Sequence, residues 1–299
     1  MPADLPLSAE LPFRADLAFR ADLHCHSSVS DGTRPPAEVI GRAAAAGLDV
    51  VALTDHDTVA GLVEARGALP PGLTLVPGME LSCRRDGHSV HLLAYLFDPE
   101  HPGLAAQCQA IRAARVDRAR AMVARLAELG APVTWDQVLA IAAGGVIGRP
   151  HIARALVAAG VVDSVPDAFT PEWIGSGGRA HVARYALDPA HAVALVREAG
   201  GVTALAHPLA QTRGPAVSDQ LIRELAAAGL AGLEVAHPDH DDAKRAALRT
   251  LAKEHGLAVT GGSDDHGQLT GDRIGCESTT AQDLRALLAG ATGAVVSTG

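Results

Sequence analysis

The sequence predicts an α/β fold in which helices cover a mostly parallel sheet. The chain has 299 residues, of which 48% are hydrophobic and only 3% aromatic, so its core is built mainly from Ala, Val, Leu and Ile. Such a core suits helices packed against a buried parallel sheet. Short apolar runs alternate with helical patterns, and several runs are followed by His, Asp or Glu. In parallel α/β folds the strand carboxyl ends share one face, which carries the functional site.

The first hundred residues show this alternation. The expected strands are 19–23, 49–53, 73–76 and 90–97, and the expected helices are 35–46 and 59–66. Proline opens the first helix and Gly47 closes it. The strand at 19–23 repeats the FRADL of residues 13–17, and we interpret that repeat as a local duplication.

The pattern then becomes purely helical. Residues 104–130 are rich in Ala and Arg with helical periodicity, and Thr134 with Gln137 makes a capping-box pattern for a second helix. Pro150 opens a third helix that ends near Gly160. We therefore expect residues 101–182 to form a helical insertion between two parts of an α/β domain, 19–100 and 183–299.

After the insertion the alternation returns. The expected strands are 202–206, 233–236, 257–260 and 294–297, and the expected helices are 189–199, 218–228, 241–255 and 281–288. Ser218 is the expected N-cap of its helix.

Charge and cysteine content limit the class of protein. The net charge of −9 argues against a basic surface for long duplex nucleic acid. The four cysteines are far apart and form no C-x-x-C pair, so we expect reduced thiols. No apolar run approaches the ~18 residues of a membrane span, and residues 1–23 lack a secretion-signal pattern. We expect a cytoplasmic protein without membrane contact; the oligomeric state stays open.

The stretch ADLHCHSSVSDGT places two histidines at the end of the first strand. Side chains alternate in a strand, so His24 and His26 point the same way and could share a metal ion. A solvated pair of histidines at a strand edge would give the same pattern, so this motif alone does not decide.

Further potential ligands follow other strands. They are His56, Glu80, His207, Asp264 and His266, and we expect them to converge with His24 and His26. His91 lies near the start of its strand, which predicts that this strand is antiparallel or displaced. In Asp264-x-His266 the alternate residues share a face, so Asp265 should point elsewhere. Mixed imidazole and carboxylate ligands suit Mn²⁺, Fe²⁺ or Zn²⁺.

At these residues the chain resembles the PHP (polymerase and histidinol phosphatase) superfamily. The matching motifs are H-x-H with S-D-G, T-D-H-D-T, P-G-x-E with a downstream V-H-x-L-x-Y, a His-Pro, and G-G-S-D-x-H. The insertion segment GRPHIARALVAAG resembles stand-alone PHP phosphoesterases, which include 3′,5′-nucleoside bisphosphate phosphatases and 5′-to-3′ exonucleases on short RNA. The resemblance implies a distorted (β/α)7 barrel with a trinuclear metal site.

The resemblance also implies a ligand set of two to three divalent ions, with Mn²⁺ preferred over Fe²⁺ and Zn²⁺. The first ion would be held by His24, His26, Glu80 and Asp264, the second by Glu80, His91 and His207, and the third by Asp31, His56 and His266. The expected catalytic residues are His207, His266 and Asp264. Composition alone does not separate His207 from His237, or His91 from His88.

Four residues are candidates for substrate binding: Arg149, His151, Arg184 and His237. Arg149 opens a helix, where anions bind, and could hold a second phosphate of the substrate. A surface arginine or a histidine in a turn would look the same in sequence.

The expected activity is hydrolysis of a phosphomonoester of a small nucleotide, such as the conversion of pAp to AMP and phosphate, with possible action on the 5′ end of short RNA. Two metal ions can activate a water and stabilise both oxygens of an in-line displacement. The alternatives are histidinol-phosphate hydrolysis and, from another class, a non-catalytic metal-stabilised module that binds nucleic acid or a polymerase.

Overall fold

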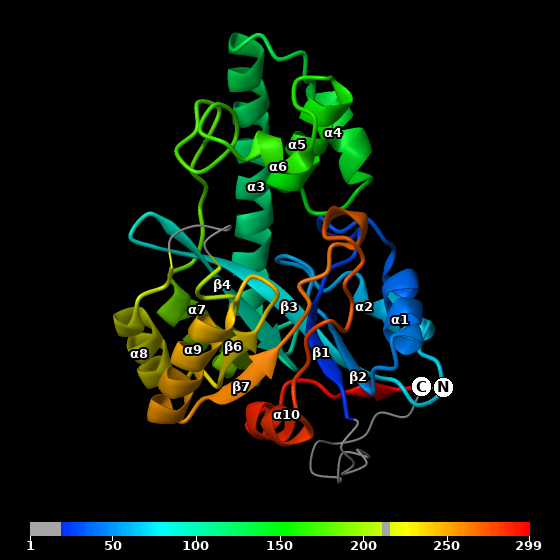
Figure 1. The fold of residues 1–299 in the computed structure, drawn as a ribbon, viewed down its shortest axis with the longest axis vertical. Helices are drawn as coiled ribbons and strands as arrows, with labels where there is room; N and C mark the ends of the chain where they lie inside the picture. The colour runs from blue at the N-terminus through cyan, green and yellow to red at the C-terminus, as the bar shows by residue number, and fades with distance from the viewer. Residues whose placement is uncertain (1–18, 211–215) are drawn as a thin grey trace.

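The computed structural model describes residues 19–210 and 216–299. The first FRADL copy, 13–17, and most of the segment judged not to be a secretion signal lie outside these residues. Figure 1 shows a barrel-like body of strands with helices around it, and one long helix, α3, that rises from the body to a group of smaller helices. None of the helices in the described segments is long and apolar enough to cross a bilayer.

Eight strands form one sheet. In sheet order they are β1 (Ala21–Cys25), β2 (Val50–Leu53), β3 (Thr74–Arg85), β4 (His88–Tyr95), β5 (Val202–Leu205), β6 (Gly232–Ala236) and β7 (Ala258–Gly261), and β8 (Ser297–Thr298) pairs with β3. β4 is antiparallel to both neighbours, whereas the other neighbouring pairs in this order are parallel. The expected antiparallel orientation of the strand that carries His91 is therefore confirmed.

The sheet closes on itself. Cys25 at the end of β1 forms a parallel bridge with Asp265, just beyond β7. The next backbone amide, that of His26, donates a hydrogen bond to the carbonyl oxygen of Asp265 at 2.9 Å. This contact between the first and the seventh strand confirms the predicted distorted (β/α) barrel.

The helices are α1 (Pro36–Ala45), α2 (Leu62–Gly67), α3 (Pro102–Glu128), α4 (Trp135–Ala142), α5 (Arg149–Ala158), α6 (Val165–Ala168), α7 (Pro189–Glu198), α8 (Asp219–Ala228), α9 (Asp242–His255) and α10 (Ala281–Leu288), with a 3₁₀ turn, η2 (Gly267–Leu269). The capping box of Thr134 with Gln137 and the N-cap at Ser218 are both present. Among the helices of residues 19–210 and 216–299, only the short α6 and η2 were not expected from the sequence.

One prediction about β3 was wrong. The sequence suggested that the strand ends at Val76 and that Glu80 follows it, because Pro77 and Gly78 usually break strands. Instead β3 continues to Arg85: its first part pairs with β2 and its second part with β4. A side chain at Gly78 would come within 2.9 Å of Thr54, so only glycine allows this close crossing. Glu80 thus lies inside a strand and points into the barrel mouth.

The helix α3 joins two apolar clusters. Its first half, including Leu104 and Ile111, packs into the cluster around the barrel. Its second half, including Met122 and Leu126, packs in a separate cluster with side chains of α4 to α6. After α4 the chain returns to the barrel, where the amide of Val146 donates to the carbonyl oxygen of Val29 at 2.8 Å. The helices above the barrel therefore rest on the loop that follows His26.

Candidate metal centre

His24 and His26 lie side by side at the carboxyl end of β1. Their Nε2 atoms are 3.1 Å apart, and both side chains are buried. The expected common orientation of the two rings is confirmed, and the alternative of a solvated pair at a strand edge is wrong.

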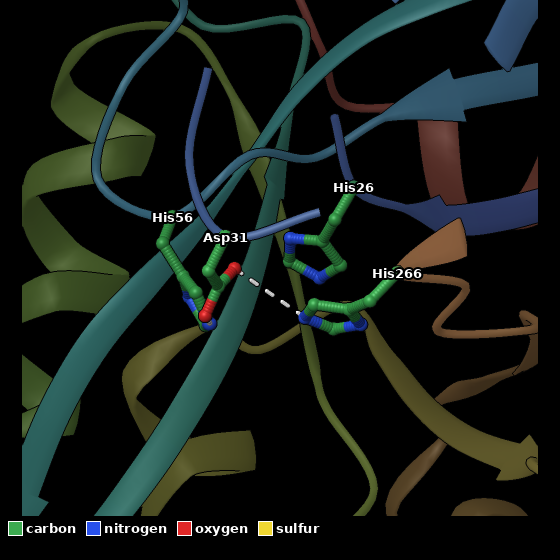
Figure 2. Close-up of side chains that lie close together, drawn as sticks. All are labelled: His26, Asp31, His56 and His266. Atoms are coloured by element: carbon green, nitrogen blue, oxygen red, sulfur yellow. Dashed lines mark ion pairs between the residues drawn. The ribbon is translucent and has the colours of Figure 1, made fainter. Parts of the chain in front are cut away.

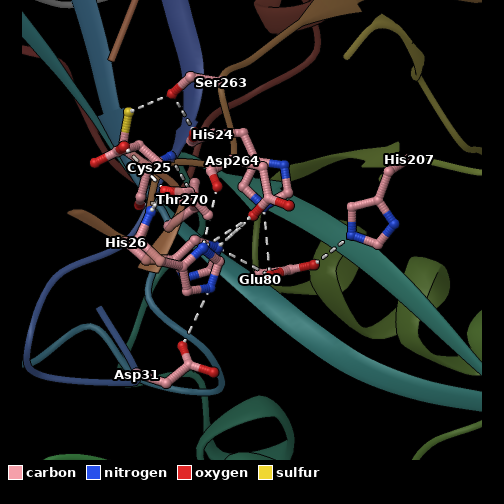
Figure 3. Close-up of polar contacts among 12 residues, drawn as sticks. His24, Cys25, His26, Asp31, Glu80, His207, Ser263, Asp264 and Thr270 are labelled. Carbon is pink, nitrogen blue, oxygen red and sulfur yellow. Dashed lines mark hydrogen bonds and ion pairs between the residues drawn. The ribbon is translucent and has the colours of Figure 1, made fainter. Parts of the chain in front are cut away.

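Glu80 lies at the middle of the site (Figure 3). Its Oε1 atom is 2.7 Å from Nδ1 of His91 and 3.1 Å from Nε2 of His207. Its Oε2 atom is 3.1 Å from Nε2 of His26 and 3.1 Å from Nδ1 of His56. The side chain of Glu80 is fully buried, so one carboxylate links imidazoles from four separate segments of the chain.

The described residues contain three groups whose ligand atoms lie within 4.8 Å of one another. They are His24, His26, Glu80 and Asp264; His26, Asp31, His56 and His266; and His56, Glu80 and His91. The first group is the set that the resemblance assigned to the first ion. The second group adds His26 to the set expected for the third ion, and the last group contains His56 where His207 was expected. His207 nevertheless faces the other oxygen of Glu80.

The group around Asp31 is formed by three loops and is shown in Figure 2. Nε2 of His266 lies 3.4 Å from Oδ1 of Asp31, and Nε2 of His56 lies 3.7 Å from Oδ2. The rings of His26 and His266 stack with centroids 4.1 Å apart. The turn after β1 thus carries Asp31 to a different group of ligands from the one that contains His24.

The site fits a divalent cation on the chemistry of its donors. Three buried atoms that face it, Oδ1 of Asp31, Nδ1 of His56 and Oε2 of Glu80, have no hydrogen-bond partner among the described residues. A buried polar atom without a hydrogen-bond partner lowers the free energy of unfolding by about 1–3 kcal/mol. A bound ion would satisfy such atoms, and imidazole and carboxylate groups are the ligands that Mn²⁺, Fe²⁺ and Zn²⁺ accept.

The electrostatics keep the carboxylates of the site ionised and give its imidazoles different protonation states. Burial would raise the pKa of Glu80, but the nearby His56, His91 and His24 hold it well below its usual range. Burial likewise opposes ionisation of Asp31, and His56 and His266 nevertheless lower its pKa. Burial lowers the pKa of His56 to about 3, so this imidazole is neutral. Burial would also lower the pKa of His26, but Asp264 and Glu80 raise it to about 9, so this imidazole holds a proton that a metal ion has to displace.

A second layer of side chains orients the ligands. Nδ1 of His24 donates to Oε1 of Glu234 at 3.0 Å, which leaves Nε2 free to face the centre. Nδ1 of His266 donates to the carbonyl oxygen of Asp264 at 3.0 Å, with the same effect. Asp265 points away, as expected, and accepts from the amides of Gly267 and Arg273. Such partners fix the tautomer and the ring orientation of a metal ligand.

Sequence reasoning missed Glu234. It lies in β6, is fully buried, and also accepts the backbone N–H of His207 at 2.7 Å through Oε2. The only signal in the sequence is that Glu234 is a charged residue within a short apolar strand. Glutamate is rarely buried in this way unless it has a partner.

His237 lies behind the candidate ligands. Its Nδ1 accepts from the amide of Asp239, so its Nε2 donates to Oδ2 of Asp264 at 3.3 Å. The side chain is fully buried. This placement favours support of Asp264 over the substrate contact that we expected for His237.

Beside the centre lies a pocket lined by arginines. Arg115, Arg118 and Arg149 line it together with Gly148 and apolar residues of α3 and α5. A side chain added at Gly148 would lie 3.3 Å from Oδ2 of Asp31 and 3.8 Å from Nη1 of Arg115, so the pocket adjoins the group around Asp31.

Arg118 and Arg149 of this pocket lie within range of the charge of Arg184, which does not line it. Burial and then the charges of Arg149 and Arg184 lower the pKa of Arg118 to about 8. Burial and then Arg115 lower the pKa of Arg184 to about 10. Within residues 19–210 and 216–299, no carboxylate forms an ion pair with Arg118, Arg149 or Arg184. A half-buried group of unpaired cations is suited to an anion.

Of the residues expected to bind substrate, Arg149 lines this pocket, and Arg184, just after the insertion, interacts with its arginines through charge. His151 is buried, and its Nδ1 accepts from the amide of Gly148 at 3.0 Å, so it caps the start of α5. Arg118 was missed because α3 is rich in exposed arginines and nothing in the sequence distinguishes this one.

Comparisons with known proteins agree with the geometry. A sequence model of the PHP domain matches residues 22–201. A 5′-3′ exoribonuclease of Haemophilus influenzae is 37% identical over 244 residues, which cover 81% of this chain and 88% of that protein. A 3′,5′-nucleoside bisphosphate phosphatase of Chromobacterium violaceum is 38% identical over 254 residues, covering 84% and 88%. A crystal structure of a predicted metal-dependent phosphoesterase from Bifidobacterium adolescentis superposes with a TM-score of 0.85 at 37% identity, covering 92% and 97%.

Proposed function

The chain belongs to the PHP domain family, and on that basis we propose that it is a metal-dependent phosphoesterase that hydrolyses a phosphomonoester of a small nucleotide. The observation that carries this proposal is the adjacency of two features: a buried set of imidazoles and carboxylates gathered around Glu80, and a pocket beside Asp31 where Arg118 and Arg149 have no carboxylate partner among the described residues. The first suits divalent ions and the second suits an anionic group of the substrate.

The centre would hold two to three divalent ions, with Mn²⁺ first and Fe²⁺ or Zn²⁺ as alternatives. The proposed ligands are His24, His26, Glu80 and Asp264 for the first, Glu80, His91 and His207 for the second, and Asp31, His56 and His266 for the third. The short distances from Glu80 to His26, His56, His91 and His207 support this set. When bound, such ions polarise a phosphate group and activate water as a nucleophile.

The chain's own residues position the reacting groups. The two carboxylate oxygens of Glu80 face different ligands, Oε1 facing His91 and Oε2 facing His26. Glu234 binds Nδ1 of His24 and so keeps Nε2 of that ring directed toward the centre. His207, His266 and Asp264 face the same space, and we propose that they contact the reacting phosphate or the ions that bind it. No serine or cysteine is needed as a nucleophile when water attacks directly.

The substrate we propose is a 3′,5′-nucleoside bisphosphate. One phosphate would lie at the centre, and the other would be held by Arg118, Arg149 and Arg184. The bisphosphate phosphatase of Chromobacterium violaceum, at 38% identity, supports this choice. Shortening of RNA from its 5′ end is the second candidate, because the exoribonuclease of Haemophilus influenzae is 37% identical and an RNA also offers a second phosphate to the arginines.

We also propose that residues 101–182 form a lid domain over a barrel formed by 19–100 and 183–299. The separate apolar cluster of α3 to α6 supports this division, and the contact of Val146 with Val29, three residues after His26, supports a lid above the centre. Three buried free cysteines, Cys25, Cys83 and Cys108, are in keeping with a cytoplasmic enzyme.

Phosphate release by the purified chain tests the proposal. After chelation and addition of Mn²⁺, we expect turnover of adenosine 3′,5′-bisphosphate, no better turnover of AMP, and little of histidinol phosphate. A short 5′-phosphorylated RNA tests the second candidate. Activity that is indifferent to chelation, or no turnover of any of these phosphoesters, would contradict the proposed function.

A further inference from the structure

We propose that Arg115, on the long helix α3, is a positioning residue of the metal centre. Through Asp57 it fixes the loop that carries His56 and the segment of β3 that carries Glu80. This inference rests on the proposed function, because it takes His56 and Glu80 as metal ligands. It assigns the insertion a part in building the centre, in addition to covering it.

The contacts form a closed network around one carboxylate. Asp57 is fully buried, and its Oδ1 accepts the amide of Ser82 at 2.8 Å. Its Oδ2 accepts the hydroxyl of Ser82 at 2.8 Å and Nε of Arg115 at 2.8 Å. Nη2 of Arg115 donates to the same hydroxyl at 2.6 Å. Arg115 thus holds both sides of the Asp57–Ser82 contact.

The network adjoins two proposed ligands along the backbone. Asp57 follows His56 directly, and its amide donates to the carbonyl oxygen of Glu80 at 3.1 Å. Ser82 lies two residues after Glu80, and His56 and Glu80 form a parallel bridge. Nδ1 of His56 and Oε2 of Glu80 lie 3.1 Å apart inside this frame. A shift of Asp57 would therefore change the distance between the two ligands.

The backbone of Asp57 has an uncommon conformation. Its φ of +56° lies in the left-handed region, which few non-glycine residues occupy, although Asp is among the more frequent of them. Arg112, one turn before Arg115 on α3, donates to the carbonyl oxygen of Asp57 at 2.7 Å. Two arginines of the same helix therefore hold the carbonyl and the carboxylate of this residue.

Stability alone does not explain this ion pair. A buried ion pair often stabilises a fold no more than well-packed apolar residues of similar volume would, and in some proteins it selects one geometry instead. Here the geometry selected is that of the loop beside His56. Arg115 also lines the arginine pocket, so the same side chain connects the proposed phosphate site to the proposed metal site.

The test measures metal binding by the full chain rather than turnover. Arg115→Met, Arg115→Lys and Asp57→Asn are compared with Arg120→Met, a control on the same helix whose exposed guanidinium lies 4.4 Å above the ring of Trp135. Mn²⁺ titration calorimetry after chelation gives affinity and stoichiometry, Co²⁺ absorption reports ligand geometry, and circular dichroism reports folding.

We expect Arg115→Met to weaken at least one Mn²⁺ site about 10–100-fold and to change the Co²⁺ spectrum, as loss of a residue that supports a ligand does. Arg115→Lys should recover part of the affinity, and Arg120→Met should bind like the unmodified chain. If Arg115→Met does not fold, the same loss in folded Asp57→Asn supports the inference.

A folded Arg115→Met or Asp57→Asn with unchanged Mn²⁺ affinity and only a lower melting temperature would overturn the inference and leave the proposed function intact. Failure of the unmodified chain to bind any of Mn²⁺, Fe²⁺ and Zn²⁺ would instead overturn the proposed function. The two failures are therefore distinguishable in one set of titrations.

Discussion

Glu234 and His24 are joined by a hydrogen bond of 3.0 Å between residues 210 positions apart in the chain. Because a carboxylate only accepts, Nδ1 of His24 carries the proton and Nε2 presents its lone pair to the centre. The other oxygen of Glu234 holds the backbone of His207, whose φ of +29° is unusual for a non-glycine residue. One buried carboxylate therefore orients a proposed ligand and the main chain of another.

Glu234→Gln should weaken Mn²⁺ binding about 10–100-fold, because an amide orients His24 less well and increases its basicity less. Calorimetry on the chelated protein measures the affinity. The matched control is Glu254→Gln, on the exposed face of α9, which should leave it unchanged. Equal affinities for the two variants would show that Glu234 does not act on the centre.

Glu80→Gln should reduce phosphate release by more than the roughly 100-fold expected for supporting residues. The change removes a charge that faces His26, His56, His91 and His207 at 2.7–3.1 Å. Steady-state assays with saturating Mn²⁺ check this, and bound metal counted by atomic absorption should fall as well. Near-normal turnover would remove Glu80 from the ligand set.

Arg118→Met and Arg149→Met should each raise KM for adenosine 3′,5′-bisphosphate about 10-fold or more. A hydrogen bond to a charged group contributes about 1.5–3 kcal/mol, and each 1.4 kcal/mol is tenfold. Hydrolysis of a substrate with a single phosphate should change much less. Arg249→Met, exposed on α9, is the control. A parallel loss on both substrates would argue against a separate site for the second phosphate.

Gly262→Ala should lower both the melting temperature and Mn²⁺ binding. An added Cβ would lie 2.4 Å from Cβ of His24 and 2.8 Å from its backbone nitrogen, so His24 would have to move. Gly41→Ala, in α1 with no atom within 4 Å of the new Cβ, should instead stabilise the fold by about 0.5–1 kcal/mol. Thermal unfolding of both variants tests the contrast.

Mn²⁺ added to the chelated protein should raise its melting temperature, because an ion that binds only the folded state stabilises it by about 2.7 kcal/mol at a concentration 100 times Kd. The shift should be smaller in Glu80→Gln. An identical shift in that variant would indicate that the ion acts elsewhere on the surface.

The local elements and the residue types of the centre could be predicted from the amino-acid sequence. Helix starts at Thr134 and Ser218 depend on contacts within one turn, which the sequence pattern contains. The common direction of His24 and His26 depends only on strand alternation. Recognition of the PHP motifs then named the candidate ligands from His24 to His266, because their spacing within each motif is local too.

Several contacts between distant residues became visible only in the folded chain. Folding extended β3 past Pro77 and Gly78, because pairing with β4 compensates for residues that break isolated strands. It brought Glu234 to His24, Arg115 to Asp57, and Arg118 to the pocket at Gly148. These contacts join residues on different elements, and their free energy depends on packing and burial, which no pattern within a short stretch of sequence encodes.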